Sequence, residues 1–379
     1  MDQPGNRSGK RIAVLIGFVA AILLVTGAVF LLRHQPWKKA ADPGEAKHDP
    51  ALPFYSSLSR KEQILFEEVR SSAKEHLKDG KAIPHAFTGE EVERVFRALE
   101  SDDPMLFYLD FGHSVCRTNG METTISLAYL IPVEEIDEKA MQLEAVGAAL
   151  SAYVAEMTED FEKELFFHDT LIDKCTFSDS ADGLGNTAFG ALVSHSADSF
   201  GYAKAMNFLL VRNGIESRLV SGSVGEGKAH CWNLVRVDGV YAHLDAAWDD
   251  PDLETESIRF HGYFNLTDDE MALDHVCLTE GLPSCGEEIG YYRKMGFAVS
   301  SREELEAFAA GRLLHAAEEN EIYFEIFPLF DIDEEELRQF LVELIDRNQE
   351  TANAFLHAVR IFGASETSSA CTVRLYKAD

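Results

Sequence analysis

The dipeptide Asp238-Gly239 separates two runs of strand-forming residues, AHCWNLVRV at 229–237 and VYAHLDAAW at 240–248. An Asp-Gly pair between two such runs is a strong signal for a β-hairpin with a two-residue turn. The turn fixes the pairing register of both strands, and the register decides which side chains share a face. The sequence therefore predicts an antiparallel pair whose facing residues can be named in advance.

This register brings two polar side chains together on one face of the hairpin. Trp232 faces Asp245, and His230 becomes a diagonal neighbour of Asp245, roughly 7–8 Å away at the backbone. A carboxylate at that separation can reach an imidazole nitrogen and fix the orientation of the ring, as the acid of a nucleophile–base–acid triad does. We interpret His230 with Asp245 as a functional pair, and His243, one step further along, as an ordinary polar residue of the sheet.

A buried helix precedes the hairpin. FGYAKAMNFLLVRN at 200–213 is apolar on most sides, Gly214 stands at the usual stop position, and a further strand is predicted at 215–221. Ser199 begins this helix, where unpaired N–H groups and positive potential can stabilise a nucleophile's negative charge. Serine is equally a preferred N-cap residue. Ser199 is thus either a cap or a nucleophile.

Three blocks, SFGYAKAMNFLLVRNGIESRLVSG, AHCWNLVRVDGVYAHLDAAWDD and YFNLTDDEMALDH, resemble the transglutaminase-like superfamily, in particular its bacterial, extracytoplasmic members. The resemblance covers roughly residues 160–280 and extends more loosely over 54–160. It implies an α+β fold with a papain-like core, in which a buried helix packs on an antiparallel sheet. It also implies a Cys–His–Asp site.

Two of the three site residues match the pattern of the family. His230 matches the base, in a His-x-Trp-Asn block, and Asp245 matches the orienting acid, in an Asp-x-x-Trp-Asp-Asp block. The position of the nucleophilic Cys holds Ser199. Cys231 does not replace it, because it follows His230 on a strand and points to the opposite face.

The exchange of Cys for Ser leaves two functions open. In the first, the chain is a pseudoenzyme with a vestigial Ser199–His230–Asp245 site that binds a peptide, a protein or a cell-wall component. Tyr202, Trp232 and Trp248 then either line the cleft or belong to the core. In the second, the same residues form a serine triad of an amide hydrolase or acyl transferase. A structural surface protein is a third, simpler possibility. No metal and no other cofactor is expected.

Other polar groups receive plainer interpretations. His168-Asp169, on a predicted helix, is interpreted as a packing position, and Asp249-Asp250 as turn residues without the ligand pattern of a calcium loop. His275 lacks further ligands at metal-binding spacing.

The charge and cysteine content narrow the possible partners. The net charge of −31 argues against nucleic acid as a partner and against anionic lipid head groups. The six cysteines contain no Cys-x-x-Cys pair, so a zinc site of that type is not expected. Cys277 and Cys285 are placed so that either a disulfide or two free thiols is compatible with the sequence.

The N-terminal region predicts a membrane anchor. Residues 12–32 are 21 residues without a charge, enough to span a bilayer as a helix. A cleaved signal peptide is the alternative. We expect a cytoplasmic tail at 1–11, a single-pass anchor at 12–32 in the cell membrane, a Pro-rich linker at 33–53 and the C-terminal domains outside the cell.

Three regions follow the linker. Residues 54–165 are predicted to be a mostly helical α+β lead-in, 166–285 the transglutaminase-like core, and 286–379 a small accessory α/β domain. Within the lead-in, capping boxes begin helices after Ser59 and Thr88, a strand is predicted at 123–131, and 133–174 is helical with a break near Thr158.

Overall fold

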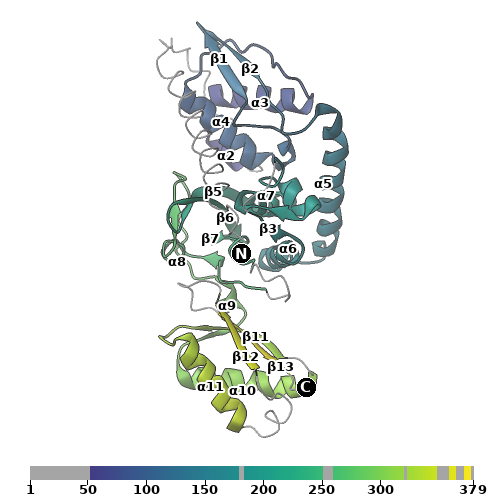
Figure 1. The fold of residues 1–379 in the computed structure, drawn as a ribbon. Helices are drawn as coiled ribbons and strands as arrows, with labels where there is room; N and C mark the ends of the chain where they lie inside the picture. Colours follow the sequence, from purple (N-terminus) through teal and green to yellow (C-terminus); the bar gives the residue numbers. More distant parts are fainter. Residues whose placement is uncertain are drawn as a thin grey trace, which may run out of the picture. The chain divides into compact units, whose positions relative to one another are not determined.

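The computed structural model describes residues 52–178, 183–250, 259–319, 322–347, 358–363 and 371–376 (Figure 1). The predicted tail, membrane anchor and most of the linker lie outside these residues. Within the described ranges, no helix combines the length and the apolar character that crossing a bilayer requires. The chain divides into two compact units, one ending at Asp137 and the other beginning at Glu138.

The first unit packs short helices beside a β-hairpin. Its elements are α2 (Pro53–Ser57), α3 (Arg60–Lys74), α4 (Gly89–Asp102), the 3₁₀ turn η1 (Pro104–Leu106), β1 (Val115–Asn119) and β2 (Glu122–Ser126). Both predicted capping boxes are present: Ser59 pairs reciprocally with Glu62 at the start of α3, and Thr88 with Glu91 at the start of α4. The helix starts in this unit are therefore encoded locally.

The strand predicted at 123–131 is shorter than expected. β2 ends at Ser126, because the chain beyond it pairs elsewhere: the Leu127 N–H donates to the carbonyl of Lys78 at 2.6 Å. Tyr129 forms an isolated bridge with Leu109. Alternating apolar residues continue past the end of the strand because they face the same core, although they no longer belong to the ladder.

The second unit begins with helices. Its first elements are α5 (Val133–Val154), which spans the division between the units, α6 (Asp160–Lys174), β3 (Thr176–Phe177), the π-helical turn η2 (Gly190–Ser194), β4 (Ser196–Ala197) and α7 (Ser199–Arg212). The predicted break near Thr158 lies between α5 and α6. Helix α7 is buried on most sides, as predicted, and ends before Gly214, whose positive φ of 82° suits glycine.

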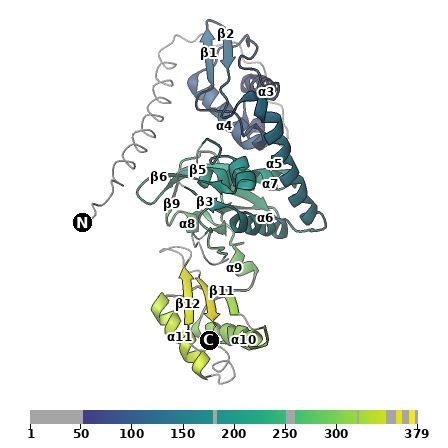
Figure 2. The ribbon, with the colours of Figure 1, turned by 45° about the vertical axis from the view of Figure 1, so that its right-hand side comes forward.

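An antiparallel sheet covers α7. It has the order β8-β7-β6-β5-β9, with β5 (Glu216–Val224), β6 (Lys228–Val237), β7 (Val240–Leu244), β8 (Phe264–Leu266) and β9 (His275–Cys277), and α8 (Asp268–Met271) lies between the last two strands. Both views place α7 beside β5 and β6 (Figure 1 and Figure 2). The predicted α+β core, a buried helix on an antiparallel sheet, is confirmed.

The hairpin has the predicted register. Asp238 and Gly239 both have positive φ, 50° and 89°, which a two-residue type I′ turn requires. Val237 pairs with Val240, and the ladder continues without a shift to Asn233, opposite Leu244. The third predicted strand is shorter than expected, because β7 ends at Leu244 instead of continuing to 248. The first is longer, because β5 continues to Val224 instead of ending at 221.

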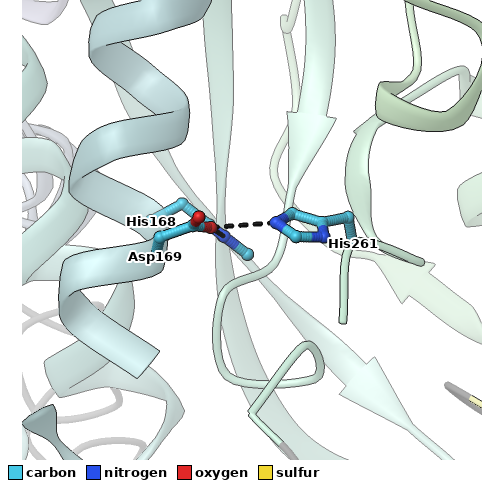
Figure 3. Close-up of side chains that lie close together, drawn as sticks. All are labelled: His168, Asp169 and His261. Carbon is cyan, nitrogen blue, oxygen red and sulfur yellow. Dashed lines mark hydrogen bonds and ion pairs between the residues drawn. The ribbon is translucent and has the colours of Figure 1, made fainter. Parts of the chain in front are cut away.

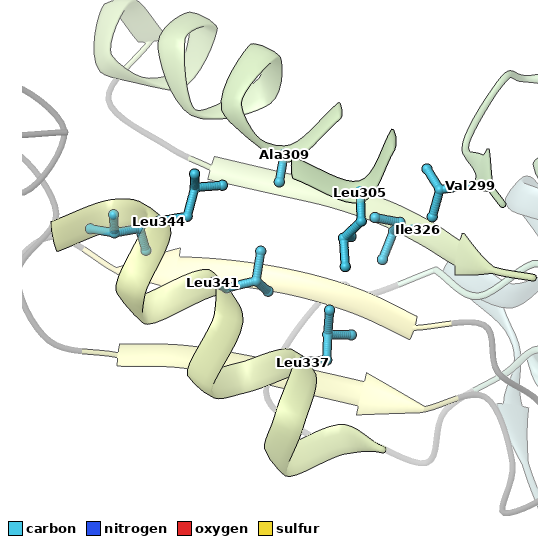
Figure 4. Packing of buried hydrophobic residues seen from close by; sticks show 8 residues of the cluster. Val299, Leu305, Ala309, Ile326, Leu337, Leu341 and Leu344 are labelled. Carbon is cyan, nitrogen blue, oxygen red and sulfur yellow. The ribbon is translucent and has the colours of Figure 1, made fainter. Parts of the chain in front are cut away.

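The C-terminal part of the second unit is a smaller α/β layer. It contains α9 (Tyr291–Lys294), β10 (Ala298–Val299), α10 (Arg302–Glu319), β11 (Ile322–Pro328), α11 (Glu334–Arg347), β12 (Ala358–Gly363) and β13 (Cys371–Tyr376), with the sheet order β10-β11-β13-β12. Its core joins both longer helices to the sheet (Figure 4), through Val299, Leu305, Ala309, Ile326, Leu337, Leu341, Leu344 and Ile345. Burial of each larger aliphatic side chain contributes about 1.5–3 kcal/mol.

Candidate active site

Asp245 lies between two imidazole rings. His230 Nε2 donates to Asp245 Oδ2 at 2.5 Å, so the contact expected from the hairpin register is present. His275 Nε2 donates to the same oxygen at 3.0 Å. All three side chains are buried. One carboxylate oxygen thus serves two histidines, one from β6 and one from β9.

The position of Asp245 is fixed by its own backbone contacts. The other carboxylate oxygen, Oδ1, accepts the backbone N–H groups of Ala247 and Trp248 at 3.1 and 3.2 Å. Burial on its own raises the pKa of Asp245, but the charges and hydrogen bonds of His230 and His275 lower it more, so the pKa lies well below its usual range. The site therefore contains an ionised carboxylate at neutral pH.

His275 faces a carboxylate at each ring nitrogen. Its Nδ1 donates to Asp274 Oδ1 at 2.5 Å, while Nε2 contacts Asp245. Burial lowers the pKa of His275, but the two acids raise it above its ordinary value. Sequence reasoning missed this residue. Asp274-His275 does close the third of the blocks that resemble the transglutaminase-like superfamily, which was the available signal.

A glycine allows β9 to approach the site. Gly222 of β5 pairs with His230 on one side and with Cys277 on the other. A Cβ atom at this position would lie 2.2 Å from the carbonyl oxygen of Val276 and 2.5 Å from the Trp232 ring. The absence of a side chain at 222 therefore lets β9 lie where His275 reaches Asp245.

Ser199 is the first residue of α7 and is not its cap. The N-cap is Asp198, whose Oδ1 accepts the backbone N–H of Gly201 at 3.0 Å. The interpretation of Ser199 as a helix cap is therefore wrong. Ser199 is 4% exposed, and among the described residues no hydrogen bond joins its hydroxyl to His230. The structure brings His230 and Asp245 into contact and leaves Ser199 outside that pair.

The aromatic residues near the site belong largely to the core. Tyr202 and Trp232 are fully buried, which favours the second of the two possibilities, that they belong to the core. The Tyr202 hydroxyl donates to Asp250, and Trp232 Nε1 donates to His243 Nδ1 at 3.0 Å. Trp248 is half-buried and packs edge-on against His275, with ring centroids 4.5 Å apart. Of the three, Trp248 alone retains exposed surface beside the site.

The buried thiols of Cys175, Cys231 and Cys285 do not replace the missing nucleophile. Five cysteines are free, and since Cys277 and Cys285 are among them, no disulfide joins these two; the others are Cys116, Cys175 and Cys231. Burial raises the pKa of Cys175 and of Cys285 to about 12, which leaves both as neutral thiols at physiological pH. Cys231 is buried on β6, where side chains alternate between the two faces of the sheet.

Two clusters near the sheet have the residue types of a metal site but not the required chemistry. Imidazole binds a metal only through an unprotonated nitrogen. In the cluster of His243, Asp268 and Cys285, His243 Nδ1 already accepts from Trp232, so the proton of a neutral ring is on Nε2, which faces Asp268. In the cluster of His230, Asp245 and His275, no carboxylate of a described residue contacts His230 Nδ1, so this ring lacks the outer acceptor that usually orients a metal-binding histidine.

Comparison with known proteins identifies a domain. The sequence model of the transglutaminase-like superfamily matches residues 148–246. No curated protein matches the chain. Among solved structures, similarity is found to a TGase, with 15% identity, a TM-score of 0.27, and coverage of 39% of this chain and 47% of that one.

Two further structures show a similar level of likeness. A candidate cysteine protease from Cytophaga hutchinsonii has 10% identity and a TM-score of 0.27, covering 45% of this chain and 73% of that one. A candidate protease from Parabacteroides distasonis has 12% identity and a TM-score of 0.22, covering 40% and 41%. The similarity spans about half the length of the TGase.

Proposed function

Because residues 148–246 form a transglutaminase-like domain, we propose that this domain is a pseudoenzyme: it binds a peptide or a cell-wall component at Ser199, His230 and Asp245 without cleaving it. The ligand class follows from the family, whose sites act on amide groups. The observation that carries the proposal is the state of Ser199, which occupies the nucleophile position without a hydrogen bond to His230.

The chemistry of serine supports this proposal. A Cys at a helix N-terminus beside an imidazole ionises near neutral pH and is then a nucleophile by itself. A Ser hydroxyl stays protonated until a base removes its proton, so the base has to lie within hydrogen-bond reach of it. Ser199 lacks that hydrogen bond, and its low exposure of 4% further limits access by a substrate.

The second histidine also supports the proposal. Catalysis requires Asp245 to stabilise the imidazolium that forms when His230 takes a proton. His275 donates to the same carboxylate oxygen, and both of its nitrogens face acids, an arrangement that suits a protonated ring. A positive His275 compensates the charge of Asp245 and reduces the stabilisation left for His230. The carboxylate is consequently shared between two rings instead of serving His230 alone.

One observation favours the alternative, a serine-dependent amide hydrolase or acyl transferase. His230 uses Nε2 to contact Asp245 at 2.5 Å, which leaves Nδ1 as the nitrogen for a nucleophile. A modest movement at the start of α7 on substrate binding is the step that this alternative requires.

A serine-directed fluorophosphonate separates the two functions. We expect no adduct on Ser199 when the full-length chain is treated and digested for mass spectrometry. Ser199→Ala and His230→Gln serve as controls, and circular dichroism establishes that each variant is folded. A stoichiometric adduct on Ser199 that disappears in His230→Gln would overturn the pseudoenzyme proposal in favour of the serine enzyme.

The variant Ser199→Cys tests the surroundings of the nucleophile position. The pKa of the new thiol, obtained from the pH dependence of its reaction with iodoacetamide, is expected to lie below that of a free cysteine, because the helix N-terminus and a nearby imidazole both favour a thiolate. The pH dependence is used instead of the rate itself because residue 199 is buried. His230→Gln in the same background should raise this pKa, and a pKa equal to that of a free cysteine would show that the site has lost its electrostatic character.

We also propose that residues 12–32 anchor the chain in the cell membrane with the described domains outside. The support is the uncharged stretch itself. In membrane vesicles, the chain is expected to resist carbonate extraction, and protease added outside intact cells should digest residues beyond the linker. Release of the chain by carbonate would contradict anchoring.

A further inference from the structure

Two imidazole rings converge on one carboxylate in a second part of the molecule, away from Asp245. His168 and Asp169 stand side by side on α6, and His261 approaches them from the segment before β8 (Figure 3). His168 Nδ1 lies 3.1 Å from Asp169 Oδ1, and His261 Nε2 lies 2.9 Å from the same oxygen. His168 is therefore more than the packing position that the sequence indicated.

The remaining nitrogen of each ring faces a second carboxylate. His168 Nε2 lies 3.2 Å from Asp249 Oδ2, and His261 Nδ1 lies 2.8 Å from Glu325 Oε1. Histidines that bind metals usually donate their other N–H to a carboxylate or carbonyl group, which directs the lone pair of the first nitrogen at the ion. Both histidines here have that outer partner, whereas the cluster around Asp245 has it for one ring only.

Packing fixes the two rings in place. His168 is fully buried and meets Phe264 edge-on at a centroid distance of 5.0 Å, and His261 stacks on Tyr291 at 3.7 Å. Ligands whose orientation is set before binding lose little conformational freedom when an ion enters. The Asp169 side chain is 21% exposed, which leaves solvent access at one side of the cluster.

The charges of the cluster are unbalanced. Asp169, Asp249 and Glu325 contact the two rings, and Asp173 lies beside them. Among the described residues, Arg259 is the one guanidinium that pairs with Asp169 and Asp173. Rings that face a carboxylate at each nitrogen suit the protonated form when no ion is bound, as at His275, and two protonated rings leave one formal negative charge in excess. A divalent ion that displaces the two protons carries the same charge in their place, so the buried carboxylates stay compensated.

We propose that His168 Nδ1, His261 Nε2 and Asp169 Oδ1 bind a divalent transition metal of the zinc class. Tetrahedral zinc with bonds of about 2.0–2.1 Å holds its ligand atoms about 3.3 Å apart. The three atoms lie within 4.8 Å of one another, and two of their separations are 2.9 and 3.1 Å. Water at the exposed side of Asp169 completes the coordination. The protons on the two ligating nitrogens leave to solvent as the ion enters.

The test uses the full-length chain stripped with a chelator and titrated with Zn²⁺ and, separately, Co²⁺. We expect one ion per chain and a tetrahedral Co²⁺ spectrum. Replacing the outer carboxylate in Glu325→Gln should weaken binding by about 10–100-fold. His261→Gln should abolish binding, and zinc should raise the melting temperature of the parent chain but not of His261→Gln.

Matched variants locate the ion. His275→Gln and His243→Gln remove a histidine from each of the other two clusters, and both should bind zinc with the affinity of the parent chain. Circular dichroism of the metal-free variants shows that each is folded. The proposal is overturned if no ion binds at one per chain, if binding persists in His261→Gln, or if His275→Gln removes it.

Discussion

The Glu164→Gln variant is expected to gain about 3 kcal/mol of stability relative to the parent chain as the pH rises from about 5.5 to about 9. Glu164 is fully buried on α6. Its Oε2 accepts from Asn265 Nδ2 at 2.7 Å, whereas Oε1 has no hydrogen-bond partner among the residues that the structure describes. Burial raises the pKa of Glu164 to about 8, and the hydrogen bond from Asn265 offsets only part of that effect.

The sign follows from the proton balance. In the unfolded chain the carboxyl group ionises near its ordinary value of 4.5, whereas in the folded chain it remains protonated up to about 8. As the pH rises from 4.5 to about 8, ionisation stabilises the unfolded chain but not the folded chain. The free energy of unfolding of the parent therefore decreases over this pH range. Gln cannot ionise, so the variant lacks this loss.

Urea denaturation of both chains across this pH range measures the effect. Glu162→Gln is the matched control, because Glu162 lies on the same helix and is exposed. The control should follow the parent at every pH. Parallel profiles for Glu164→Gln and the parent would show that Glu164 is not the buried neutral acid inferred here.

The second large effect is expected at the site itself. Asp245→Ala should lower the free energy of unfolding by about 3–5 kcal/mol at neutral pH. The substitution leaves the donating nitrogens of His230 and His275 without their acceptor, together with the backbone N–H groups of Ala247 and Trp248. Because the pKa of Asp245 is lowered by folding, its contribution is present above the ordinary value of 3.8 and is lost on acidification below it.

A conservative variant and a mutant cycle separate the contributions. Asp245→Asn retains an acceptor for the two backbone groups and should lose less stability than Asp245→Ala. Combining Asp245→Asn with His230→Gln or with His275→Gln gives the coupling energy of each histidine to the acid. A loss below about 1 kcal/mol in Asp245→Ala would contradict the view that the two rings depend on this carboxylate.

Local signals in the sequence accounted for the centre of the fold. The turn at Asp238-Gly239 set the pairing of β6 with β7, and the helix α7 with its stop at Gly214 followed from apolar residues and one glycine. The contact of His230 with Asp245 followed in turn, because it depends on a register that two adjacent residues define. These features need no information from distant segments.

Features that depend on distant pairing were not predictable. β9 joins the edge of the sheet beside β5, and no turn residue connects the two strands, so nothing in the sequence between them sets their register. His275 reaches Asp245 only through that pairing. The contact of His261 with Glu325 likewise joins segments separated by 64 positions. Burial of Tyr202 and Trp232 depends on elements that pack from several directions, which periodicity alone does not reveal.

The residue at position 222 controls how many rings contact the acid of the site. Since any side chain there would collide with the backbone of the neighbouring strand, glycine is a condition for a site in which one acid serves two rings. An alanine or a larger residue at 222 would push β9 away from β5, and Asp245 would then contact His230 alone. The edge strand of the sheet is thus part of the site, because its distance from β5 decides whether the acid contacts one ring or two.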